Sequence, residues 1–163
     1  MLYPWLNYLH ILGVFSFLMA HGVSAGVAFA LRRERNPERI RSLLDLSSSS
    51  IGILHSSIFL LLLTGIINGF IGQWWGRGWI WLSLAILIAI YVYMGLAASG
   101  FYSQVRKATG LAYMEGFKQH LPAEPASQQE IDALLKSPRP IQLAATGLGG
   151  LAIIAWLMIF KPF

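Results

Sequence analysis

The chain has 163 residues, of which 56% are hydrophobic and only 12% are charged. Because a water-soluble domain carries about a quarter charged residues, this composition indicates one integral membrane domain over residues 1–163. The absence of cysteine excludes disulfides, iron–sulfur clusters and thiolate zinc sites. The net charge of +5 does not indicate nucleic-acid binding, because ten of the twelve Lys and Arg residues lie in segments 32–41 and 106–139, which is how membrane proteins distribute topology charge.

Four uncharged stretches predict four membrane-spanning helices. Each stretch exceeds the roughly 20 residues that cross about 30 Å of hydrocarbon, and backbone groups in lipid must be satisfied within the segment, which requires helices. The expected fold is therefore an all-α four-helix bundle embedded in a lipid bilayer. The helices are expected near residues 4–31, 46–71, 79–104 and 141–160.

Basic residues predict the orientation. The first and third connections hold five Lys or Arg each, so the positive-inside rule places both termini outside and both connections in the cytoplasm of a bacterial inner membrane. In the first connection, Asn36-Pro37-Glu38 is typical of a helix start, so the second helix is expected to begin near Pro37. In the third, Ser127 and Glu130 form a capping-box pattern that predicts a short amphipathic helix on the cytoplasmic surface.

Small residues recur at the spacing of helix contacts. Gly22 and Gly26 form one GxxxG pattern, and Gly65 and Gly69 form another. Such positions let helices approach closely. They predict a compact bundle and a homodimer or larger membrane complex.

Three histidines lie inside the apolar spans, where a polar, metal-competent side chain is costly and indicates a functional site. By the helical rise, His21 lies about 15 Å and His55 about 14 Å from the cytoplasmic ends of their antiparallel helices. The two are therefore expected at one depth on facing helices, which is how bundles build cofactor sites. His10 lies about one turn inside the outer interface, where Met158 is a weak additional ligand candidate.

Imidazole suits haem iron, copper or zinc, and the residues alone leave three interpretations open. His21 and His55 ligate a cofactor, they form a structural pair with each other or with nearby serines, or they belong to a proton path. Haem b is the favoured cofactor, held by His21 and His55 with His10 as a further candidate. Copper is the weaker alternative because the five methionines do not cluster. His120, in the third connection, is expected to have no role.

Three motifs carry a resemblance to a known family: Leu9-His10-Ile11-Leu12-Gly13, Gly76-Arg77-Gly78-Trp79-Ile80-Trp81 and Phe160-Lys161-Pro162-Phe163. With them the chain resembles an uncharacterised bacterial family of four-helix integral membrane proteins. That family is similar to copper-resistance D membrane domains and to HemJ-type protoporphyrinogen oxidases.

The resemblance to HemJ-type enzymes, which bind haem b, implies roles for His10 and Lys161. Those enzymes also carry a histidine and a lysine on the third helix, and this chain has neither between Trp79 and Gly100. This difference argues against the oxidase reaction and leaves haem binding, with His10 as a ligand, as the implied property.

The sequence thus favours a b-type haem protein that transfers electrons or oxidises a small redox species within the membrane. The alternative is a non-catalytic membrane subunit or scaffold whose histidines are internal polar contacts.

Overall fold

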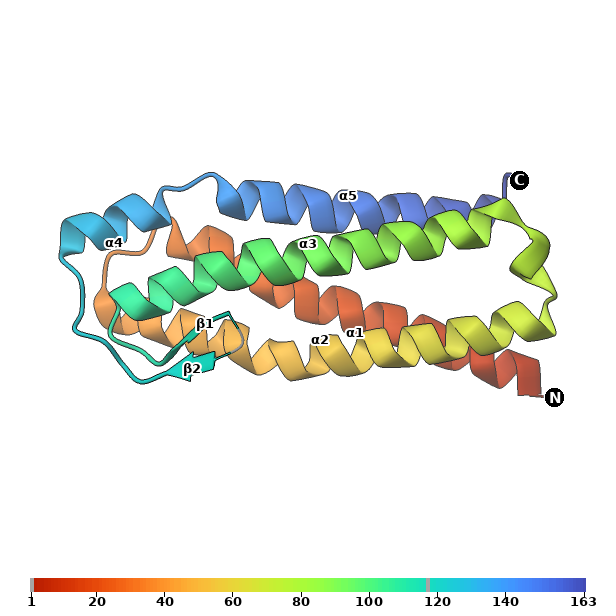
Figure 1. The fold of residues 1–163 in the computed structure, drawn as a ribbon, viewed down its shortest axis with the longest axis horizontal. Helices are drawn as coiled ribbons and strands as arrows, with labels where there is room; N and C mark the ends of the chain where they lie inside the picture. The colour runs from red at the N-terminus through yellow and green to blue at the C-terminus, as the bar shows by residue number, and fades with distance from the viewer. Residues whose placement is uncertain (1, 117) are drawn as a thin grey trace.

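A computed structural model describes residues 2–116 and 118–163. Three long helices and a fourth helical stretch are long and apolar enough to cross a membrane, which supports a multi-pass membrane protein. They run side by side as an elongated bundle (Figure 1). The helices are α1 (Leu2–Leu31), α2 (Pro37–Ile71), α3 (Gly78–Ala108), α4 (Gln128–Leu135) and α5 (Arg139–Phe160), with the short 3-10 helix η1 (Trp74–Gly76) between α2 and α3.

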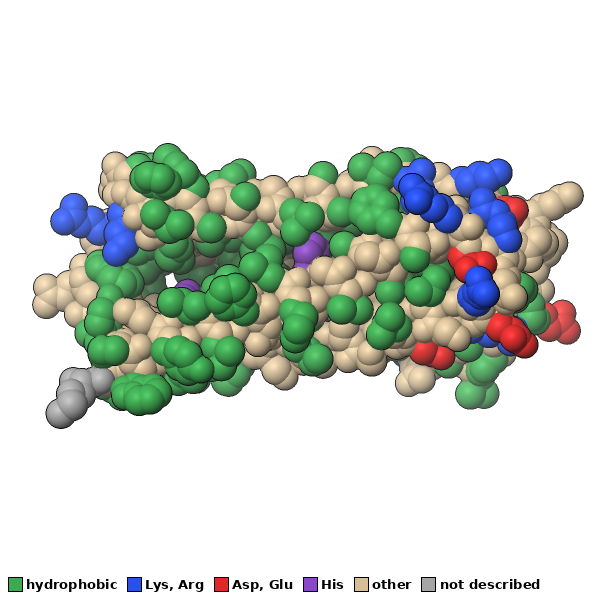
Figure 2. All heavy atoms as spheres, turned by 180° about the vertical axis from the view of Figure 1, so that it is seen from behind, with side chains coloured by type: hydrophobic (Ala, Val, Ile, Leu, Met, Phe, Trp, Pro, Cys, Tyr) green, Lys and Arg blue, Asp and Glu red, His purple; other side chains and the backbone are tan. Residues whose placement is uncertain are grey.

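The two ends of the bundle differ in composition. We call the end that carries residues 32–41 and 106–139 the basic end, and the end that carries residues 72–81 and both chain termini the tryptophan end (Figure 1). In the space-filling view, blue and red side chains gather mainly at the basic end, while hydrophobic side chains cover the middle of the molecule (Figure 2).

The spanning helices pack as two pairs, α1 with α2 and α3 with α5, and the contacts between the pairs are much sparser. In the first pair, Gly13 lets α1 approach Leu61 of α2, and Phe17 joins Ile58 and Leu61 in a buried cluster. In the second pair, Gly150 of α5 receives the Ile90 side chain of α3. Each pair therefore packs as a unit, and the packing between the two pairs is looser than the packing within them.

At the basic end the two pairs are joined by one hydrophobic core. Its buried residues come from α1, α2, α3 and the amphipathic helix α4: Val27, Leu31, Ile40, Leu44, Phe101, Val105, Ala108, Ile131 and Leu135. The Tyr102 hydroxyl adds a cross-pair hydrogen bond of 2.6 Å to the Ser24 carbonyl oxygen.

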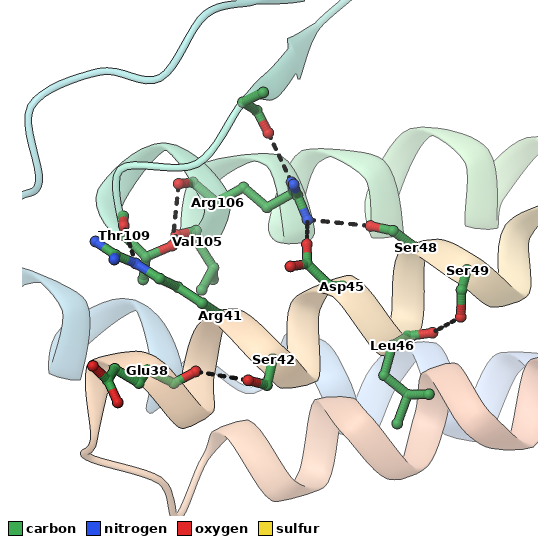
Figure 3. Close-up of polar contacts among 11 residues, drawn as sticks. Glu38, Arg41, Ser42, Asp45, Leu46, Ser48, Ser49, Val105, Arg106 and Thr109 are labelled. Carbon is green, nitrogen blue, oxygen red and sulfur yellow. Dashed lines mark hydrogen bonds and ion pairs between the residues drawn. The ribbon is translucent and has the colours of Figure 1, made fainter.

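Two arginines hold the chain that leaves α3 at this end (Figure 3). Arg41 of α2 donates from Nε to the Thr109 carbonyl oxygen at 2.9 Å. Arg106 donates to the Ala112 carbonyl oxygen at 2.7 Å and to Asp45 Oδ1 at 3.0 Å. The backbone carbonyl groups near the end of α3 have no partner within the helix, and these bonds provide one. Side-chain hydrogen bonds therefore stabilise the basic end together with its hydrophobic core.

At the tryptophan end the C-terminal residues return onto the turn between α2 and α3. Trp79 N–H donates to the Phe163 carbonyl oxygen at 3.3 Å, and the Lys161 ammonium lies 4.4 Å from the Trp74 ring centroid and 5.5 Å from that of Trp79. Such cation–π contacts attract the ammonium to the ring face. The tail thus ties α5 to the beginning of α3.

The sequence predictions of helix starts are confirmed. The Asn36 side-chain oxygen accepts from the N–H groups of Glu38 and Arg39, so α2 begins at Pro37 and enters the bundle as one rod. Ser127 and Glu130 form the predicted capping box at the start of α4. The sequence analysis missed a small hairpin between α3 and α4, in which β1 (Tyr113–Glu115) pairs antiparallel with β2 (Lys118–His120).

The two GxxxG patterns differ in what they contact. Gly22 and Gly26 are exposed, and a Cβ added at either would have no neighbour within 4 Å among the described residues, so the first GxxxG pattern does not mark a close approach of another described helix. The second does make contacts: Gly65 faces the His10 ring and Gly69 faces the Trp75 ring. These glycines make room for side chains rather than for a neighbouring backbone.

Candidate functional site

His10 is half-buried on α1 and faces α2. Its Nδ1 lies 2.9 Å from the Thr64 hydroxyl oxygen, and its Cε1 lies 3.2 Å from where a Cβ of Gly65 would stand. Gly65 therefore provides the space in which the ring lies, and Thr64 fixes the direction in which it points.

The hydrogen bonds of Thr64 determine the tautomer of His10. The Thr64 hydroxyl has one hydrogen, and it donates to the Leu60 carbonyl oxygen one turn earlier at 2.6 Å. Its oxygen must then accept from His10, so the proton of the neutral imidazole is on Nδ1. The Nε2 lone pair is left free, which is the state that a metal-ligating histidine requires.

His21 is buried, with 5% of its surface exposed, and it faces α5 rather than α2. Its ring stacks parallel to Phe17, with centroids 6.2 Å apart. A Cβ at Gly147 would overlap the Nε2 and Cε1 atoms of His21, so only glycine fits there. The Nε2 atom has no hydrogen-bond partner among the described residues.

His55 is exposed on α2 and meets α3. Its ring lies edge-on to Tyr91, with centroids 6.2 Å apart. His21 and His55 thus both point across the boundary between the pairs, but His21 meets α5 whereas His55 meets α3. The structure does not join them through a hydrogen bond within residues 2–116 and 118–163, so their joint ligation of one haem stays a prediction.

Of the three serines expected as structural partners of the histidines, Ser24, Ser56 and Ser57, two make other hydrogen bonds. Ser24 lies 3.3 Å from the Ser47 hydroxyl and 3.1 Å from that of Ser50, between α1 and α2. Ser57 donates to the Ile53 carbonyl oxygen of its own helix at 2.7 Å. These bonds engage Ser24 and Ser57, whereas Ser56 is exposed next to His55.

The remaining predicted positions lie at opposite ends. His120 is on β2, where it stacks on Tyr113 and its Nε2 lies 3.9 Å from a Glu115 carboxylate oxygen. Met158 is on α5 and packs against the buried cluster of Trp79, Ile80 and Leu157 at the tryptophan end.

Sequence reasoning missed Thr64 and Asn68, which share the buried face of α2 with a four-residue spacing. Threonine and asparagine inside an apolar span were a signal, because each is a polar group that needs a partner. Thr64 orients His10. Within residues 2–116 and 118–163, the Asn68 Oδ1 atom is buried without a hydrogen-bond partner, as is Trp75 Nε1 on η1.

These polar groups lie toward the end of the bundle that is hollowed between the pairs. In Figure 2 an opening is visible between the two layers of helices at the tryptophan end, and histidine side chains are seen along this gap. The basic end shows no comparable opening in this view, although a pocket lined by Phe101, Ala108 and Leu134 lies there between α3 and α4.

The donor set does not suit a metal ion held by protein side chains alone. Within the described part of the chain, no three His, Asp or Glu side chains gather where they could hold one metal ion, whereas structural zinc takes four protein ligands and catalytic zinc three. Haem needs only one or two axial ligands from the protein. His10 has a free Nε2 and an oriented ring for such a role, while at His21 the backbone of Gly147 lies against Nε2.

Comparison of the chain with protein-family models, with curated proteins and with solved structures finds no match.

Proposed function

We propose that this protein is a b-type haem protein of the bacterial cytoplasmic membrane that transfers electrons or oxidises a small redox species. Both termini and the tryptophan end face outward, and the basic end, with the surface helix α4, faces the cytoplasm. The excess of Lys and Arg at the basic end supports this orientation.

The observation that carries the proposal is the arrangement of His10. Its Nδ1–H is held by Thr64, its Nε2 lone pair is free, and its ring lies over Gly65 in the half of α1 nearer the tryptophan end. Ligating imidazoles almost always donate their second nitrogen to an oxygen acceptor, which fixes the tautomer and raises the basicity of the ligand. Here the acceptor is already in place on the neighbouring helix.

In this site a bound haem would supply one-electron chemistry at its iron. The chain's own residues supply the rest. His10 would hold the iron, Thr64 orients the ring, and the apolar walls of the two helix pairs exclude water, which tunes the redox potential of the iron.

The haem site predicted from the sequence, at His21 and His55, is an alternative to the site at His10. If His21 and His55 hold the haem, α1 must move from Gly147 so that the His21 Nε2 becomes free, and His55 must leave the edge of Tyr91. The sparse contact between the pairs makes such a movement the least costly one in the bundle. His10 requires no rearrangement of its hydrogen bond.

The test is an absorbance spectrum of the protein purified after haem-replete expression. We expect a Soret band in the parent, and its loss or marked change in His10→Ala. Thr64→Val should lower haem affinity about 10- to 100-fold, because it removes the acceptor that orients the ligand.

Two variants serve as controls. Thr109→Val removes a buried threonine hydroxyl at the basic end, and His120→Ala removes the half-buried histidine of β2; both should keep the spectrum. If His21→Ala or His55→Ala loses haem while His10→Ala keeps its haem spectrum, the haem site lies at mid-membrane and not at His10. A colourless parent would refute the haem function.

A second function is favoured by the packing of His21. Its ring fills the space above Gly147 and connects the two pairs, as expected in a non-catalytic subunit whose histidines are polar contacts. In that case all variants are colourless, while His21→Ala lowers the thermal stability of the protein.

A further inference from the structure

Two buried polar atoms at the tryptophan end, Asn68 Oδ1 and Trp75 Nε1, have no hydrogen-bond partner in the part of the chain that the structure describes. Asn68 is 3% exposed. An unpaired buried donor or acceptor costs about 1–3 kcal/mol. Two such atoms in one place therefore point to something that binds them.

The two atoms lie at the same turn of α2. Gly69 follows Asn68 directly on α2, and Trp75 Nε1 lies 3.2 Å from where a Cβ of Gly69 would stand. The absence of a side chain on Gly69 is what lets the indole reach this turn of the helix. Thr64, which orients His10, lies one turn further into the bundle on the same face of α2.

The chemistry of the two atoms defines the ligand. Indole Nε1–H only donates, and Asn68 Oδ1 only accepts, so a single ligand that pairs with both atoms needs an acceptor oxygen and an O–H donor. The site is in an apolar span next to the rings of Trp75, Phe70 and Trp81, with Phe70 and Trp81 each 5.4 Å from Trp75 by ring centroid. A flat aromatic body that dissolves in lipid meets these conditions.

We propose that the tryptophan end binds the aromatic head group of a lipid-soluble quinol, whose hydroxyl oxygen accepts from Trp75 Nε1–H and whose hydroxyl hydrogen is donated to Asn68 Oδ1. This names the small redox partner of the proposed haem centre and in that sense rests on the proposed function. The binding itself needs no haem. Because a quinone has no O–H, it pairs only with Trp75 and binds more weakly than the quinol.

The experiment measures binding of a short-chain quinol, decylubiquinol, and of the corresponding quinone to the purified full-length protein in lipid nanodiscs by calorimetric titration. Empty nanodiscs correct for partition into lipid. We expect Asn68→Leu to weaken quinol binding about tenfold and to remove the preference for quinol over quinone, since one hydrogen bond is lost. Trp75→Phe, which keeps a ring but removes the N–H, should weaken binding of both forms.

The matched control is Trp156→Phe, which changes an exposed tryptophan of α5 and should leave both affinities unchanged. Equal quinol binding in the parent, Asn68→Leu and Trp75→Phe would overturn the proposal, as would binding no stronger than that of empty nanodiscs. A quinol preference that depends on Asn68 in a colourless protein would support the site and refute the haem. A haem spectrum without quinol binding would support the haem and refute the quinol site.

Discussion

The packing of His21 on Gly147 makes a prediction that does not depend on any cofactor. In Gly147→Ala the new Cβ would lie less than 3.0 Å from both Nε2 and Cε1 of His21, a separation that real Cβ atoms do not show. The imidazole cannot easily turn away, because it is buried and stacked parallel to Phe17. Either the ring or α5 must shift.

The expected magnitude combines two effects. Overpacking of this kind costs about 1–3 kcal/mol, while replacing a helical glycine by alanine gains about 1 kcal/mol from helix propensity. Gly149→Ala isolates the second effect, because a Cβ at Gly149 would have no neighbour within 4 Å. Gly147→Ala should therefore be about 1–3 kcal/mol less stable than Gly149→Ala, or roughly 2–12 °C lower in melting temperature for a chain of this size.

The assay is thermal unfolding in detergent followed by tryptophan fluorescence, with the His21→Ala background as the second arm of a double-mutant cycle. In that background the ring is absent, so the two alanine variants should be equally stable. Equal stability in the parent background would refute the contact between α1 and α5. A difference that persists without the ring would place its cause elsewhere on α5.

Three further predictions concern the polar parts of the chain. Because there is no native cysteine, Gln73→Cys should label with an impermeant thiol reagent in intact cells and Gln128→Cys should not; the opposite pattern would reverse the orientation. Ser127→Ala removes the capping box of α4 and should cost about 1 kcal/mol, seen as faster amide exchange confined to α4; unchanged exchange would contradict this. The backbone N–H groups of Asn36 and Arg35 bind the Glu34 carboxylate and hold its pKa below the ordinary value, so its stabilising effect is present above the unfolded pKa and lost as pH falls through the lower folded pKa. Glu34→Gln should flatten the acid side of the melting-temperature curve, and an unchanged curve would exclude this role.

Local sequence signals determined the helices and their ends. Uncharged runs longer than a bilayer require helices whatever their neighbours are, and caps such as Asn36 and Ser127 bind backbone groups within a few residues of themselves. Both kinds of signal act over short distances along the chain, so they can be recognised from the sequence without a structure. The depth of a histidine follows from the same rise per residue.

What each helix face meets was decided only by the tertiary structure. One turn of a helix offers several faces, and the sequence does not say which neighbour covers them, so the pairing of His21 with Gly147 and of His55 with Tyr91 appears only when α1 meets α5 and α2 meets α3. The same is true of the GxxxG patterns, since Gly65 faces His10 while Gly22 faces no part of the chain. The candidate site likewise depends on residues 54 positions apart, His10 and Thr64. Its hydrogen bond arises because two antiparallel helices pack in one register, and packing over the whole helix length sets that register.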